Sequence, residues 1–268
     1  AAAEEGYRTA VTLLGRRDVE PGVDDGAPTH DRYLEAVSAL GAASGSQSWA
    51  FPLRQQPLQP AAETVLTAWG AGNSAAGAQL AEAHLVRMLR MWRPDVVLTH
   101  GPAPRGDAPT THLIHQLVLE AVEAAGDPTR FPEQIQWLGL TTWQPRKAFG
   151  YEPGQTSGSI ALKRDQVMAR TALSLDDFSE RFRSLVHDGR VSGPPLMTCR
   201  MVWNRTASAA APRELFAGID LPIGGEARRP AAMENAENRV RMRRTAERQR
   251  HLEAIVLQRS GAVGAGLL

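Results

Sequence analysis

The sequence has few of the features that define several common protein classes. It has 268 residues and a single cysteine, Cys199, so it forms neither an internal disulfide nor a metal cage built from cysteines. No stretch approaches the roughly 20 apolar residues that a membrane-spanning helix needs, so we expect no such helix. Basic and acidic side chains nearly balance, 30 against 29, which excludes a nucleic-acid-binding surface over the whole molecule but not a local basic patch.

Several catalytic and binding motifs are also missing. No serine stands in a G-x-S-x-G sequence, so a serine hydrolase has no support. No G-x-G-x-x-G or P-loop sequence occurs, so nucleotide binding through these motifs has no support either. The first residues do not show a charged segment followed by an apolar run, so no secretory signal is visible and the compartment stays open. What remains is a globular composition, 43% apolar and 22% charged.

Apolar runs and helical patterns alternate along the first half of the chain. We expect strand 9–14, helix 29–41, strand 49–53, helix 79–91, strand 96–99 and helix 110–125. This alternation is typical of a parallel sheet flanked by helices, in which ligands collect at the loops after the carboxyl ends of the strands.

The second half is less regular. We expect strands at 137–143 and 196–203, a helix that begins at Ser174 with an acidic first turn, and a long charged helix at 232–259.

The expected fold is therefore α/β and Rossmann-like, with a mainly parallel sheet flanked by helices. Residues 96–99 are expected to form a central strand of this sheet. We expect residues 1–150 to form the α/β domain, and residues 151–268 to form the C-terminal part of the same domain, with an irregular extension.

Four residues suited to a metal site follow the strand at 96–99: His100, Asp107, His112 and His115. Imidazole is the commonest metal ligand, and a catalytic zinc needs about three protein ligands plus an open position for water. His112 and His115 are three positions apart at the start of a helix, so they share one face. The alternative interpretation is structural: His112 lies on the helix surface, and His115 lies at the edge of the core, bonded to a backbone carbonyl.

These residues resemble the LmbE/PIG-L family of zinc-dependent N-acetylglucosaminyl deacetylases. The likeness lies in RPDVVLTH at 93–100, a Gly/Asp/Pro loop, a histidine that opens the next helix, and LVLEAV at 117–122. The sequence RYLE at 32–35, followed by Ala36, Leu40 and Gly41, is similar to another family helix. Three later stretches look like the longer bacterial branch of the family: FPEQ at 131–134, LFAGI at 215–219 and GGEARR at 224–229. The resemblance covers residues 1–150 well and the remainder loosely.

The resemblance implies a hydrolase that cleaves a linear amide bond and removes an N-acetyl group from an amino sugar or its conjugate, with Zn²⁺ as cofactor. It implies His112 as a zinc ligand, with His115 as the second choice. Asp107 is the candidate catalytic carboxylate or an orienting partner of a histidine, and its alternative is a turn residue. His100 faces the substrate or structures the loop.

The family's HPDDE motif, which supplies a zinc-binding His and Asp and the general base, does not occur in this sequence. Asp24 and Asp25 form the only double Asp near the start, and we interpret them as a solvated turn. The simplest account is an N-terminal truncation that removed the first strand. We then expect this chain to be an inactive fragment that binds zinc weakly and exposes an unpaired strand edge at 9–14. Two alternatives stay open: a non-catalytic member that binds a carbohydrate or a partner, and an α/β protein whose histidines are structural.

Arginines supply two further candidates. The resemblance implies that Arg32 contacts the sugar substrate, and the alternative is that Arg32 pairs with Glu35 along its helix. The arginines of the helix at 232–259 attract phosphates or, as we favour, form ion pairs on a solvated face. The expected partner is a small amino-sugar substrate rather than nucleic acid, and the oligomeric state stays open.

Overall fold

The computed structural model does not describe the whole chain. It describes residues 7–14, 16–17, 30–48, 50–53, 61–102, 108–153, 160–168, 172–186, 196–206 and 214–220. The expected helix at 232–259 and the candidate Asp107 lie outside these residues.

The chain divides into two units, Ala1–Arg130 with Thr142–Asp220, and Phe131–Thr141 with Leu221–Leu268. The described part of the second unit contains the short helix α6 (Pro132–Gln136). The strand expected at 137–143 does not form. Trp137 instead donates its backbone N–H to Glu133 at the end of α6, and Gly139 takes a φ of 66°, which an extended strand does not allow.

The first unit contains three separate sheets in the described residues. The largest has the strand order β5 (Val96–His100), β6 (Lys147–Pro153), β8 (Leu196–Asn204) and β7 (Ile160–Lys163). The two smaller sheets pair β1 (Ala10–Leu13) with β3 (Ser44–Gln47), and β2 (Arg16–Arg17) with β4 (Pro52–Leu53).

The α/β class is confirmed, but the sheet differs from the expected one. The pairs β1–β3, β2–β4 and β5–β6 are parallel, whereas β8 runs antiparallel to both β6 and β7. The largest sheet is therefore mixed. Within the described residues β5 pairs only with β6, so it lies at an edge of this sheet and is not a central strand. The expectation failed because the local pattern of β8 predicts a strand but does not fix its direction.

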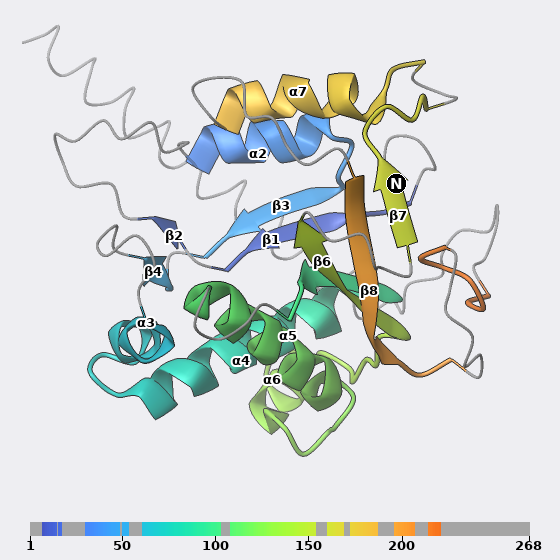
Figure 1. Cartoon of the computed structure of the whole chain (residues 1–268). Helices are drawn as coiled ribbons and strands as arrows, with labels where there is room; N and C mark the ends of the chain where they lie inside the picture. The colour runs from blue at the N-terminus through green and yellow to red at the C-terminus, as the bar shows by residue number, and fades with distance from the viewer. Residues whose placement is uncertain are drawn as a thin grey trace, which may run out of the picture. The chain divides into compact units, whose positions relative to one another are not determined.

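The helices of the first unit form two groups (Figure 1). Helix α2 (His30–Ala39) packs against α7 (Leu175–Val186), and α3 (Ala62–Trp69), α4 (Ser74–Trp92) and α5 (Pro109–Ala125) pack against one another. Helix α5 also contacts β5, so it covers the sheet next to the strand that ends at His100. No described helix is long and apolar enough to cross a membrane.

Local signals explain the ends of the two longest helices. Asn73 caps α4, because its side-chain oxygen accepts the backbone N–H of Ala76 at 3.1 Å. The helix ends where Arg93 adopts a left-handed conformation (φ 49°) directly before Pro94, which cannot continue it. Helix α5 begins with Pro109, whose fixed φ and missing N–H suit a first turn. Along the chain, β5 follows the end of α4 and precedes the start of α5.

Among the described residues, two apolar clusters stabilise the first unit. One is formed by residues of the helices α3, α4 and α5, the turn before β4 and the residue directly after β1, and consists of Leu14, Phe51, Val65, Trp69, Ala81, Leu113 and Leu117. The other lies on the largest sheet and joins Phe149, Ile160 and Cys199, with Leu215 packed against it. Burying an apolar side chain of this size stabilises the fold by about 1.5–3 kcal/mol.

Arg90 is completely buried and forms hydrogen bonds with the last residues of α5. Its guanidinium donates hydrogen bonds to the carbonyls of Ala125 at 3.2 Å and Ala124 at 3.3 Å. It also donates to the carbonyls of Asp127 and Arg130, both at 2.8 Å. A cation beside the last carbonyls of a helix interacts favourably with the helix dipole. Arg90 therefore links α4 to the turn that follows α5.

Besides the packing of Leu215, a hydrogen bond and a ring contact hold the segment 214–220. The buried Lys147 donates from Nζ to the carbonyl of Ala217, and burial lowers the pKa of this amine. The ring of Tyr7 stacks on Phe216 with the centroids 4.2 Å apart.

Candidate functional site

The candidate site lies where β5 and β6 end. These strands are parallel and in register, so their carboxyl ends meet at one edge of the sheet, which is where α/β folds bind ligands. His100 is the last residue of β5, and helix α5 begins at Pro109. The connection between them contains residues 103–107, which the structure does not describe.

His115 is fastened to this edge. It is buried on α5, with 6% of its surface exposed, and its Nδ1 lies 2.8 Å from the carbonyl oxygen of His100. A carbonyl only accepts hydrogen bonds, so Nδ1 carries the proton and donates it. In the neutral ring Nε2 is then the nitrogen with the free lone pair. The hydrogen bond fixes both the tautomer and the orientation of this imidazole.

Gly150 permits the close approach of the two strand ends. A Cβ atom at this position would lie 2.8 Å from Cα of Gly101 and 3.3 Å from the carbonyl oxygen of His100. The backbone N–H of Gly101 donates to the carbonyl of Tyr151 at 2.7 Å. The carbonyl that receives the His115 hydrogen bond is therefore positioned by β6 as well as by β5.

Two effects act on the His100 imidazole. Desolvation by the surrounding protein lowers its pKa, and the neighbouring His115 lowers it further. The residue is nevertheless exposed, so part of its surface reaches solvent. Both effects disfavour the charged ring. The neutral form of His100 is therefore favoured.

The structure brings His100 and His115 together. Of the other predicted residues it describes His112 and Arg32, whereas Asp107 lies outside the described residues. His112 is half-buried one turn before His115 on α5, and its backbone N–H donates to Ala108 at 2.9 Å. Arg32 is exposed on α2, a helix that packs against α7 and β3, whereas α5 packs against α4, α3 and β5.

A zinc site is not completed by the described residues. Among them, no group of three His, Cys, Asp or Glu side chains lies close enough to hold a metal ion. His115 does show the hydrogen bond to a backbone carbonyl that commonly orients metal-binding histidines. The described donor set does not fit a catalytic zinc by itself, since such a site needs about three protein ligands.

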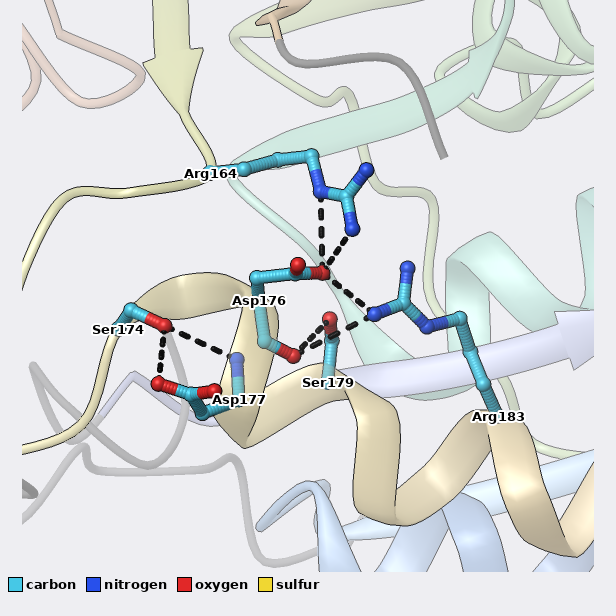
Figure 2. Close-up of polar contacts among 6 residues, drawn as sticks. All are labelled: Arg164, Ser174, Asp176, Asp177, Ser179 and Arg183. Atoms are coloured by element: carbon cyan, nitrogen blue, oxygen red, sulfur yellow. Dashed lines mark hydrogen bonds and ion pairs between the residues drawn. The ribbon is translucent and has the colours of Figure 1, made fainter. Parts of the chain in front are cut away.

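A second polar cluster, which sequence reasoning missed, lies at the start of α7 (Figure 2). Asp176 Oδ1 accepts hydrogen bonds from Arg164, through Nε at 3.0 Å, and from Arg183, at 2.5 Å. These arginines lower the pKa of the Asp176 carboxyl. Ser174 caps the helix, because its Oγ accepts the backbone N–H of Asp177 at 3.0 Å. The acidic first turn was predicted, but Arg164 is distant in sequence and gave no local signal.

A cavity of about 340 Å³ opens beside the second half of α5. Its lining carries four carboxylates and one guanidinium, from Glu82, Glu120, Glu123, Asp127 and Arg130. Arg130 pairs with Glu82, and burial raises the pKa of Glu82. The residues that line it come from α4, α5 and the turn after α5, and Glu120, the first of them on α5, stands five positions after His115, about 7.5 Å along the helix. The lining of this cavity therefore does not include the ends of β5 and β6.

No model of a protein family and no curated protein matches this chain significantly. Solved structures similar to it include the conserved protein TT1542 from Thermus thermophilus, with 19% identity, a TM-score of 0.43, and 69% of this chain and 68% of that chain covered. Another is N,N'-diacetylchitobiose deacetylase from Pyrococcus horikoshii, with 14% identity and a TM-score of 0.45 over 69% of this chain and 61% of that chain. A third is GalB, the 4-carboxy-2-hydroxymuconate hydratase from Pseudomonas putida, with 16% identity and a TM-score of 0.45. This match covers 78% of this chain and 89% of that chain. Every TM-score is below 0.5, so these likenesses carry no argument about the chain's function. They give no support to the expected N-terminal truncation, which stays a prediction.

Proposed function

We propose that the full-length protein, with any residues that precede this chain, is a zinc-dependent hydrolase that removes an N-acetyl group from an amino sugar or its conjugate. In this reaction water adds to the amide, the C–N bond breaks, and acetate and a free amine leave. The proposal is supported by the resemblance of residues 93–122 and 32–41 to the LmbE/PIG-L family. The α/β fold, with His100 at the carboxyl end of β5, is consistent with it.

One observation carries the proposal: the hydrogen bond from His115 Nδ1 to the His100 carbonyl. It prepares Nε2 of His115 to act as a metal ligand. In this proposal His115 and His112 bind zinc, Asp107 is the catalytic carboxylate, and Arg32 and His100 contact the sugar. The described residues supply fewer than three ligands, so no reaction step is assigned to the metal.

Zinc content tests the ligand assignment. The full-length protein is purified with zinc and analysed by plasma mass spectrometry, alongside His115→Gln, His112→Gln and the control His84→Gln. His84 is also a partly buried helical histidine, but it lies on α4, where it contacts Arg87 at 3.1 Å. We expect zinc in the wild type and the control, and its loss in both His112→Gln and His115→Gln. Equal zinc in wild type and His115→Gln would overturn the assignment.

The second candidate is a non-catalytic protein of the same fold that binds a carbohydrate or a partner. It is compatible with the hydrogen bond from His115 to the His100 carbonyl, which a histidine that binds no metal can also make. In that case the His115 hydrogen bond is purely structural. Sugar binding without zinc and without acetate release would support this candidate against the hydrolase.

A further inference from the structure

We infer that Tyr151 donates a hydrogen bond to the bound amino sugar at the edge where β5 and β6 end. The inference rests on the proposed function for the class of ligand. It does not depend on whether the bound sugar is then hydrolysed.

Strand register places Tyr151 beside His100. The two residues are partners in the parallel ladder, and adjacent strands lie about 4.8 Å apart. Side chains at paired positions project from the same face of a sheet. The phenol and the imidazole therefore stand next to each other at the carboxyl edge.

The paired residues His100 and Tyr151 belong to a line of neighbouring residues that crosses the four strands of the sheet. Tyr151 pairs with Cys199 on β8, and Cys199 pairs with Ile160 on β7. Cys199 and Ile160 are buried, Tyr151 is half-buried, and His100 is exposed. Tyr151 thus stands at the boundary between the apolar cluster on this face and the solvent-facing edge. An aromatic residue at such a boundary presents an apolar ring and a polar tip.

The phenol is suited to donate. Burial raises the pKa of Tyr151, and the neighbouring Cys199 raises it further, so the hydroxyl keeps its proton at neutral pH. The hydroxyl and acyl oxygens of an N-acetylated sugar are acceptors for such a donor. The ring also offers an apolar surface against which a sugar ring can pack.

The backbone gives Tyr151 a fixed position relative to the histidines. Its carbonyl accepts the N–H of Gly101, and the adjacent Gly150 allows the chain after His100 to cross closely. The His100 carbonyl in turn receives the hydrogen bond from His115. A donor on this scaffold is oriented before the ligand arrives, which reduces the entropy lost on binding.

The test compares the full-length wild type with Tyr151→Phe and the control Tyr7→Phe, using N-acetylglucosamine as the probe. Tyr7 is also half-buried, and its ring stacks on Phe216, a contact that Phe retains. One NMR sample reports two quantities: saturation transfer measures binding, and the acetate methyl signal measures hydrolysis. Thermal melting checks that both variants fold.

We expect Tyr151→Phe to weaken sugar binding by about 2- to 10-fold, the effect of losing one hydrogen bond between uncharged groups, while Tyr7→Phe binds like the wild type. Equal binding by Tyr151→Phe and wild type would overturn the inference, and acetate release in that case would keep the hydrolase. Tyr151-dependent binding without acetate release would keep the inference and overturn the hydrolase. No binding by the wild type would overturn both.

Discussion

Replacing Arg90 by methionine removes hydrogen bonds to four carbonyls from one buried point of the fold. The two carbonyls with the shortest bonds, those of Asp127 and Arg130 at 2.8 Å, lie in the turn after α5, where water can partly replace the guanidinium. The carbonyls of Ala124 and Ala125 each keep one other partner, the N–H groups of Asp127 and Trp143. The carbonyl of Asp127 also accepts the N–H of Arg130 at 3.3 Å, so three of the four carbonyls keep a backbone partner.

The magnitude follows from these partners. Hydrogen bonds to a charged group contribute about 1.5–3 kcal/mol each, and the two short bonds together give about 3–6 kcal/mol. Removing the buried guanidinium also removes the cost of desolvating it, so we expect a loss near the lower end, about 3 kcal/mol. Lysine has three donors on a flexible stem and lacks the planar fork, so Arg90→Lys should recover only part of this loss.

Urea unfolding followed by circular dichroism measures the effect. The control is Arg87→Met, because Arg87 is exposed one turn earlier on the same helix. We expect this control to change the free energy of unfolding by less than about 0.5 kcal/mol. A similarly small change for Arg90→Met would refute the claim that Arg90 fastens α5.

Three further predictions concern other parts of the first unit. Because Arg164 and Arg183 lower the pKa of Asp176, its stabilising effect is present above the unfolded-state pKa, about 3.9, and is lost as the pH falls through the lower folded-state value. Asp176→Asn should therefore destabilise the protein at pH 7, and acid titration of stability should show this difference shrinking below about pH 4. Gly150→Ala should cost about 1–3 kcal/mol in urea unfolding, because its Cβ meets backbone atoms that cannot give way easily; stability equal to the wild type would show that the strand ends relax. Tyr33 has a buried hydroxyl without a hydrogen-bond partner among the described residues, and burial raises its pKa to about 12. Tyr33→Phe should leave the melting temperature unchanged or raise it, and a clear drop would reveal a partner for the hydroxyl.

The sequence predicted those elements whose signals are local. Strand β5 and helix α5 were expected because an Arg-Pro pair, a β-branched run, a Pro-bearing start and a Gly-Asp-Pro end all lie within the segment. Strand β8 was also expected within one residue, at 196–203 against Leu196–Asn204. Its antiparallel pairing was not, because direction and register depend on contacts with β6 and β7.

The sequence predicted only part of the candidate site, because some of its contacts join residues that are far apart along the chain. The sequence placed His100 at a strand end, and its structural alternative for His115 included the hydrogen bond to a backbone carbonyl that the structure shows. It did not single out Tyr151, since the pairing of this residue with His100 spans 51 positions. Nor did it identify Arg90, whose acceptors lie 34 to 40 residues further along the chain.

Acetate release from an N-acetylated amino sugar by the full-length protein tests the central claim most directly. The protein is assayed as purified with zinc, after removal of the metal by a chelator, and after zinc is restored. The account predicts release of acetate and free amine in equal amounts, loss of the activity on chelation, and its return with zinc. Zinc-loaded protein that binds the sugar and releases no acetate would contradict the account.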